Sequence, residues 1–187
     1  MKTMIRFSVV ALMMLAICTV TGFARLAMAK SAVEIDTAVN ASLKTLFGES
    51  TAAKDLSKIA KGILVFPGIY KGGLIVGGQY GEGALLKEGK TAGYYNTVAA
   101  SYGLQAGAQK FGYAMFFLDE ASLAYLNKSD GWEIGVGPNI TVVDEGIARS
   151  LSTTTAKAGI YVFFFDQKGL MAGLGIQGSK ITKITPE

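Results

Sequence analysis

The chain of 187 residues contains no histidine and a single cysteine, Cys18. Without histidine, the usual serine–histidine–aspartate triad, the cysteine–histidine dyad and the histidine-based zinc site are all excluded. Cys18 lies in an apolar N-terminal run, so the chain beyond that run has no thiol for a disulfide, a thiolate metal site or a nucleophile. We therefore expect a protein that is not an enzyme and that holds no metal or cofactor.

Residues 1–29 have the pattern of a secretory signal peptide. Lys2 and Arg6 precede or open an apolar run over 7–20, and the small residues Ala27 and Ala29 stand at the positions that signal peptidase requires. The run is shorter than the ~20 apolar residues of a membrane span, which favours cleavage over a retained anchor. Cys18 is a weak candidate for lipid attachment, because Ile17 stands where lipoproteins carry a small residue. We expect export to the periplasm or cell envelope.

Cleavage would leave residues 30–187, a length typical of a single domain with one core. It would also remove three of the 18 basic residues, so that 15 face 14 acidic ones and the net charge falls from +4 to +1. A protein with so little excess positive charge is a poor candidate for nucleic-acid binding. An anionic partner would have to be bound by a local basic patch.

The apolar spacing predicts an α+β fold. Two helices are expected at the N-terminus, one over residues 31–48 with Ser31 and Glu34 as a capping box, and one from Ser50 or Thr51 to about Gly62. About ten short, mostly antiparallel strands should follow and curl into a barrel- or sandwich-like sheet. One short helix over 120–127 is inserted, and hairpin turns are predicted at 87–90 and 166–169. The predicted strands cover 63–66, 73–80, 83–88, 92–98, 102–109, 112–117, 132–136, 140–143, 159–165, 170–177 and 180–184.

Several local motifs resemble functional ones but favour simpler interpretations. The glycines of 173–178 match a dinucleotide fingerprint, yet too little chain follows to form the required helix. Residues 84–91 end like a phosphate-binding loop but lack its first glycine. The carboxylate clusters 119–120, 130 with 133, and 144–145 lie beside glycines or helix starts, where they act as turn formers and caps. None of these motifs makes a convincing active site.

A basic stripe is the preferred candidate for a binding site. Lys54, Lys58 and Lys61 recur on one side of the second predicted helix, and Lys71 follows beyond the turn at Pro67. Lysines beside an apolar helix face suit an anionic membrane surface. An ordinary solvated helix face explains the same spacing, and spacing alone favours this second explanation.

Five segments of the chain, in order, resemble the SYLF domain family. They are AKGILVFPG at 60–68, GGLIVGGQYGEG at 72–83, SYGLQAG at 101–107, GWEIGVGP at 131–138 and KGLMAG at 168–173. The resemblance extends over nearly all of residues 33–184. It implies binding of phosphoinositides or other anionic lipids through a basic N-terminal surface, which maps onto Lys54, Lys58, Lys61 and Lys71.

Some members of this family are linked to actin, but the predicted signal peptide argues against an actin role for this chain. The expected protein is an exported bacterial stand-alone member that is associated with the membrane through anionic lipid. Surface docking and enclosure of an acyl chain both remain open. The alternative function is an envelope protein–protein interaction module that would use exposed aromatics at 94–95 or 163–165, although a buried strand explains the latter run more simply.

Overall fold

A computed structural model describes residues 30–73, 76–102, 107–128, 130–157, 159–169, 176 and 178–187. The predicted signal peptide, including Cys18, and most of the predicted strand 170–177 lie outside these residues. Ser31–Glu187 forms one compact unit that contains every element described below.

The first helix, α2 (Ala32–Glu49), confirms the sequence prediction. Ser31 is its N-cap: the Ser31 hydroxyl accepts from the Glu34 amide, and the Glu34 carboxylate accepts from the Ser31 amide, as in a capping box. The apolar residues that recur every three to four positions are buried against the sheet, namely Ile35, Val39, Leu43 and Leu46. A second helix, α3 (Thr51–Leu56), follows directly and is shorter than predicted.

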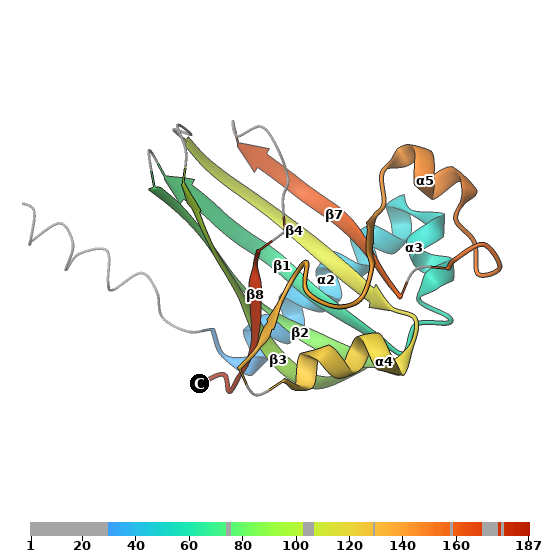
Figure 1. Ribbon diagram of the computed structural model, residues 1–187, viewed down its shortest axis with the longest axis horizontal. Helices are drawn as coiled ribbons and strands as arrows, with labels where there is room; N and C mark the ends of the chain where they lie inside the picture. Colours follow the sequence, from blue (N-terminus) through green and yellow to red (C-terminus); the bar gives the residue numbers. More distant parts are fainter. Residues whose placement is uncertain are drawn as a thin grey trace, which may run out of the picture. The chain divides into compact units, whose positions relative to one another are not determined.

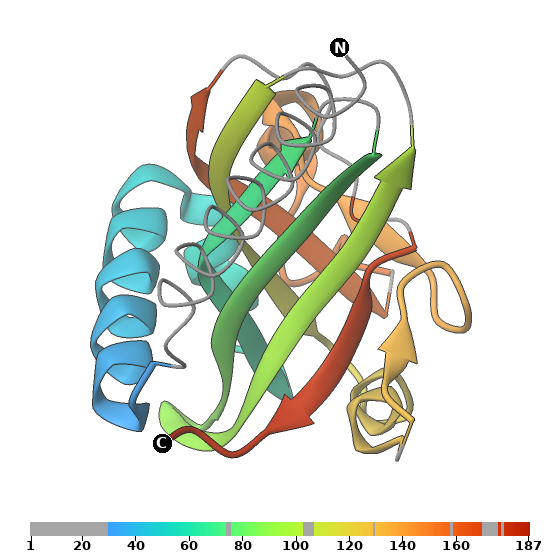
Figure 2. The same cartoon turned by 90° about the vertical axis from the view of Figure 1, so that its left-hand side faces the viewer.

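The sheet contains eight strands within the described residues, fewer than the predicted ten. The strands are β1 (Gly62–Gly73), β2 (Val76–Lys87), β3 (Lys90–Tyr102), β4 (Gly107–Phe117), β5 (Trp132–Glu133), β6 (Ile140–Val142), β7 (Ile160–Gly169) and β8 (Lys180–Ile184). Their order is β5-β8-β3-β2-β1-β4-β7-β6, and only the β6–β7 pair is parallel. Figure 1 and Figure 2 show that the long central strands curl into an open half-barrel.

Glycines explain why the strands are longer than predicted. β1 continues through Pro67 and Gly68 with a bulge between Val65 and Ile69, so the predicted turn there is wrong. Gly81 and Gly83 of β2 lie opposite this bulge. A Cβ at Gly81 would lie 2.6 Å from Ile69, and one at Gly83 would clash with the Val65 carbonyl. These glycines therefore permit close backbone approach inside one strand instead of ending it.

The two predicted hairpin turns have different outcomes. At 87–90 the turn is present, and Glu88 (φ 52°) and Gly89 (φ 75°) both have the left-handed conformation of a type I′ hairpin. At 166–169 no turn forms, because β7 continues to Gly169 and Asp166 (φ 53°) accommodates a bulge against β4. The short helix is confirmed as α4 (Glu120–Leu123) followed by the 3-10 turn η1 (Ala124–Asn127), whereas α5 (Glu145–Ser150) was not predicted.

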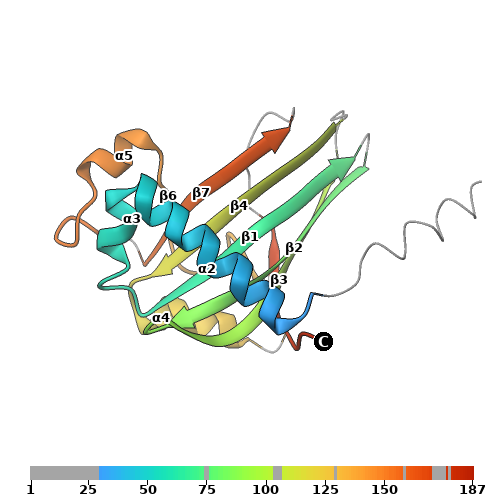
Figure 3. The same ribbon diagram turned by 180° about the vertical axis from the view of Figure 1, so that it is seen from behind.

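Two hydrophobic clusters cover the two faces of the sheet. On one face, α2 and α3 pack on Val65, Ala84 and other side chains of the central strands; we call this the helix face. On the other face, α4, η1 and Trp132 pack on Leu64, Met115 and their neighbours; we call this the inner face. Figure 3, seen from behind, shows α2 crossing the strands obliquely and leaving the far ends of β1, β2, β4 and β7 beyond it.

Candidate functional site

The lysines predicted to share one helix face do not all belong to a helix. Only Lys54 lies within α3, which ends at Leu56. Lys58 lies in the turn that follows α3, where the regular helical hydrogen bonds of the backbone end. The Lys61 amide then donates to the Phe117 carbonyl at 2.7 Å. The predicted helix to Gly62 is therefore wrong, because the chain from Lys61 onward exchanges helical bonds for pairing with β4. All three side chains are exposed near the start of β1.

Lys58 forms an ion pair with Asp55. Its Nζ lies 2.6 Å from the Asp55 Oδ1, and the two side chains are 63% and 35% exposed. An exposed pair of this kind contributes only about 0–1 kcal/mol to stability. The ammonium group therefore remains accessible to an anionic ligand, although Asp55 offsets part of its charge.

Lys71 lies apart from these three lysines. It lies in β1, ten residues beyond Lys61, which immediately precedes this strand; this corresponds to about 30 Å at the usual rise per residue. In the alternation of β1, Lys71 shares the inner face with Ile69, and its cross-strand neighbours are Gln79 and Gln109. The structure therefore separates the four lysines into a group of three and a single residue on another face.

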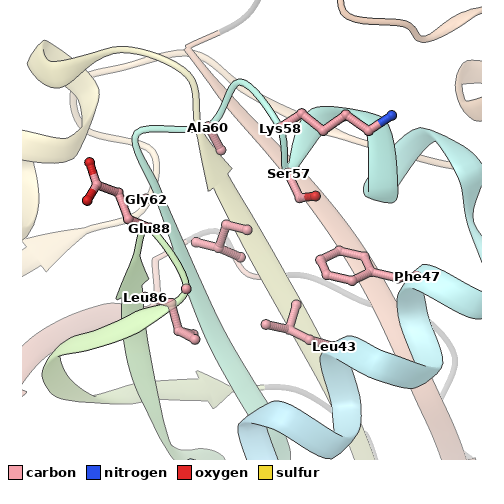
Figure 4. Close-up of a pocket in the computed structure, with 10 residues that line it drawn as sticks. Leu43, Phe47, Ser57, Lys58, Ala60, Gly62, Leu86 and Glu88 are labelled. Carbon is pink, nitrogen blue, oxygen red and sulfur yellow. The ribbon is translucent and has the colours of Figure 1, made fainter.

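A pocket of about 320 Å³ lies beside Lys58, between α2, the turn after α3 and the β2–β3 hairpin. Figure 4 shows Leu43 and Phe47 from α2 on one side and Leu86 from the end of β2 on the other. Ile63 also lines the pocket. Such a volume is at the lower end for small-molecule sites, whose walls are mostly apolar.

Charged side chains occur at two places around this pocket. Lys58 lines it from the turn after α3, and Glu88 lines it from the hairpin, on the opposite side in Figure 4. The pocket can accept an apolar group against Leu43, Phe47 and Ile63 while an anionic group contacts Lys58. Glu88 would repel that anion, so an anionic group can be accepted only on the Lys58 side of the pocket.

The sequence identified Lys58 as a candidate binding residue but none of the other residues that line the pocket. Phe47 lies one helical turn after Leu43, and extending the apolar stripe by that turn would have found it. Leu86 and Glu88 come from the hairpin, whose approach to α2 depends on strand pairing. No local pattern marks them as neighbours of the turn after α3.

Two of the three carboxylate clusters, 119–120 and 144–145, provide helix N-caps, as the sequence predicted. Asp119 Oδ1 accepts from the Ser122 amide at 2.6 Å at the start of α4, and Asp144 Oδ1 accepts from the Ile147 amide at 2.8 Å at the start of α5. Within the described residues, no group of three or more acidic side chains lies close enough to hold a metal ion.

Most of the aromatic side chains considered for protein interaction are buried or hydrogen-bonded within the fold. Tyr95, Phe163 and Phe165 are buried, which confirms the interpretation of 163–165 as a buried strand. The Tyr94 hydroxyl donates to the Asp36 Oδ2 at 2.9 Å, joining α2 to β3. Partial burial and this bond raise the pKa of Tyr94. Among the described residues, the large aromatic side chains that are exposed are instead Tyr70 and Tyr80.

No helix among the described residues has the length and apolar content that a membrane crossing requires. No protein-family model matches this chain, and a search of curated proteins gives no match either. The resemblance to the SYLF domain family therefore rests on the five sequence segments alone.

Proposed function

We propose that this chain is an exported, SYLF-like protein without enzymatic activity, and that it binds anionic lipid at a site formed by Lys54, Lys58, Lys61 and the pocket beside Lys58. The observation that carries the proposal is the position of Lys58 at the rim of an apolar pocket. A phospholipid combines an anionic headgroup with an apolar chain, and these two parts match the ammonium group and the pocket walls.

The electrostatic contribution can be estimated per lysine. Each lysine near an anionic bilayer contributes about 1 kcal/mol, which corresponds to about a fivefold change in affinity. Three lysines together would account for a change of about a hundredfold. Asp55 carries the opposite charge beside Lys58, so the Lys58–Asp55 pair as a whole adds less than an unpaired lysine would.

Co-sedimentation with vesicles tests the proposal. Residues 30–187 should bind phosphatidylcholine vesicles that contain phosphatidylglycerol, and binding should decrease at high salt because charges in solution are screened. Changing Lys54, Lys58 and Lys61 to glutamate should abolish this binding. The matched control is Lys183→Glu on β8, whose exposed side chain lies outside this site. Equal binding by the triple variant and the control would contradict the proposal.

Two further variants refine the site. Glu88→Gln removes the negative charge at the pocket rim and should tighten binding, whereas Lys71→Gln decides whether the distant lysine contributes. Binding to pure phosphatidylcholine vesicles that survives the triple lysine change would indicate that the pocket encloses an acyl chain without help from charge.

A further inference from the structure

Two exposed tyrosines lie side by side on the part of the helix face that α2 leaves uncovered. Tyr70 of β1 is paired with Tyr80 of β2, and Tyr80 is paired with Val98 of β3. Their side chains are 59%, 46% and 45% exposed, respectively. They are three of the seven large hydrophobic side chains exposed in the described residues, and they are consecutive across one row of the sheet.

Lysines continue the same row on both sides. Tyr70 is paired with Lys110 of β4, which is paired with Lys168 of β7, and Val98 is paired with Lys180 of β8. All three lysines are exposed. At about 4.8 Å between neighbouring strands, this tyrosine–lysine row, which comprises Lys168, Lys110, Tyr70, Tyr80, Val98 and Lys180, spans about 24 Å.

The strand alternation places the row on the helix face. In β2, Tyr80 shares its side with Ala84 and Leu86, which pack under α2. In β4, Lys110 shares its side with Ala114 and Phe116 of the same cluster. The row therefore lies beyond α2, in the region that Figure 3 shows at the far ends of the central strands.

The tyrosines are held in place by polar contacts. The Tyr80 hydroxyl donates to the Glu82 Oε1 at 2.7 Å, and the Lys110 Nζ lies 5.4 Å from the centre of the Tyr70 ring. On the side away from α2, the next row contains only small residues, Ala108, Gly72, Gly78 and Ala100. Among the described residues of this next row no large side chain flanks the two rings, which agrees with the exposure of Tyr70 and Tyr80.

We propose that the tyrosine–lysine row is a second membrane-contact surface, which docks on the anionic headgroups of a phospholipid bilayer. Tyrosine combines an apolar ring with a polar tip and suits the boundary between water and lipid. Lysines at both ends of the row add attraction to anionic lipid. Apart from the tyrosines, every ionisable side chain in the row is a lysine, so the row carries only positive charge.

Charge complementarity also argues against pairing of two copies through this face. Because lysines lie at both ends of the row, a two-fold related pair of rows would bring lysines against lysines. Like charges placed opposite one another are destabilising. An anionic surface has no such conflict.

The inference rests on the proposed affinity for anionic lipid but uses different residues, so the two can fail separately. Vesicles of phosphatidylcholine and phosphatidylglycerol should bind the variant Lys110→Gln, Lys168→Gln, Lys180→Gln about a hundredfold more weakly than the wild type, at about fivefold per lysine. The matched control Lys183→Gln should bind as the wild type does, because Lys183 alternates to the other side of β8. Loss of binding in this row variant but not in the Lys54, Lys58, Lys61 variant would support the row and reject the pocket site.

A labelled cysteine reports contact directly, since residues 30–187 contain no cysteine of their own. A nitrobenzoxadiazole label at Val98→Cys should shift its emission to the blue on these vesicles, as the probe leaves water. The control is Val136→Cys, which is also exposed but lies in the loop after β5. An equal response at both positions would overturn the proposal. So would binding that the Lys110→Gln, Lys168→Gln, Lys180→Gln variant leaves unchanged. Failure of the wild type to bind anionic vesicles would overturn both proposals together and favour an acidic protein as the partner.

Discussion

Replacing Asp55 by asparagine removes the carboxylate that pairs with Lys58 and leaves the ammonium group unpaired. The pair is short, with 2.6 Å between Nζ and Oδ1, but the two side chains are 63% and 35% exposed. We therefore expect Asp55→Asn to change the free energy of unfolding by no more than about 1 kcal/mol. Removal of one negative charge beside Lys58, at the proposed pocket site, should tighten binding to anionic vesicles about fivefold.

A double-mutant cycle separates the two charges. Lys58→Gln should weaken binding about fivefold, and the double variant Asp55→Asn, Lys58→Gln should bind about as the wild type does. The measurement is the partition coefficient on vesicles of phosphatidylcholine and phosphatidylglycerol at low salt. At high salt the differences should disappear, because the Debye length decreases to about 3 Å at 1 M.

The matched control for this cycle is Asp130→Asn, which removes the same charge at an exposed position outside the α3 region. It should leave binding nearly unchanged. If Asp55→Asn binds no more tightly than Asp130→Asn, Lys58 does not contact the headgroup and the reasoning about the pocket rim is refuted.

Two further predictions concern the fold and its pH dependence. Gly83→Ala should destabilise the protein by about 1–3 kcal/mol in thermal denaturation, because the new methyl group meets the Val65 carbonyl. The control Gly48→Ala, at an open position near the end of α2, should be neutral or stabilising. Equal melting temperatures of the two variants would contradict this. Burial and the hydrogen bond to Glu82 raise the pKa of Tyr80 to about 12. As the pH rises, the unfolded chain loses this proton first, so the free energy of unfolding should fall between about pH 10 and 12. This fall should be smaller in Tyr80→Phe, and an identical pH profile of the two proteins would reject the assigned shift.

Local patterns predicted the parts of the fold that depend on neighbouring residues. The capping box at Ser31, the apolar stripe of α2 and the turn at Glu88 and Gly89 each need only a few consecutive positions. The end of α3 could not be predicted in this way. Lys61 leaves the helical pattern because its amide pairs with Phe117, a residue 56 positions later in the chain.

The strand count was overestimated for a related reason. Gly81, Gly83 and the Pro67–Gly68 pair are typical of turns in the sequence, yet they lie within strands where a bulge in β1 meets β2. The candidate site shows the same limit. Lys58 was identified from its charge, whereas Leu86 and Glu88 become neighbours of it only through the pairing of β1 with β2. The row of Tyr70 and Tyr80 requires the register of several strand pairs at once.

The order of the strands in the sheet has a consequence for self-association of the chain. Its outermost strands are β5, with two residues, and β6, with three, whereas the central strands have ten or more. Edge strands offer unpaired backbone groups to other chains, and very short ones offer too few for a stable added strand. The long, glycine-rich strands β1 and β2 lie in the middle of the sheet and are paired on both sides along their length. The two short edge strands therefore disfavour edge-to-edge polymerisation of the sheet.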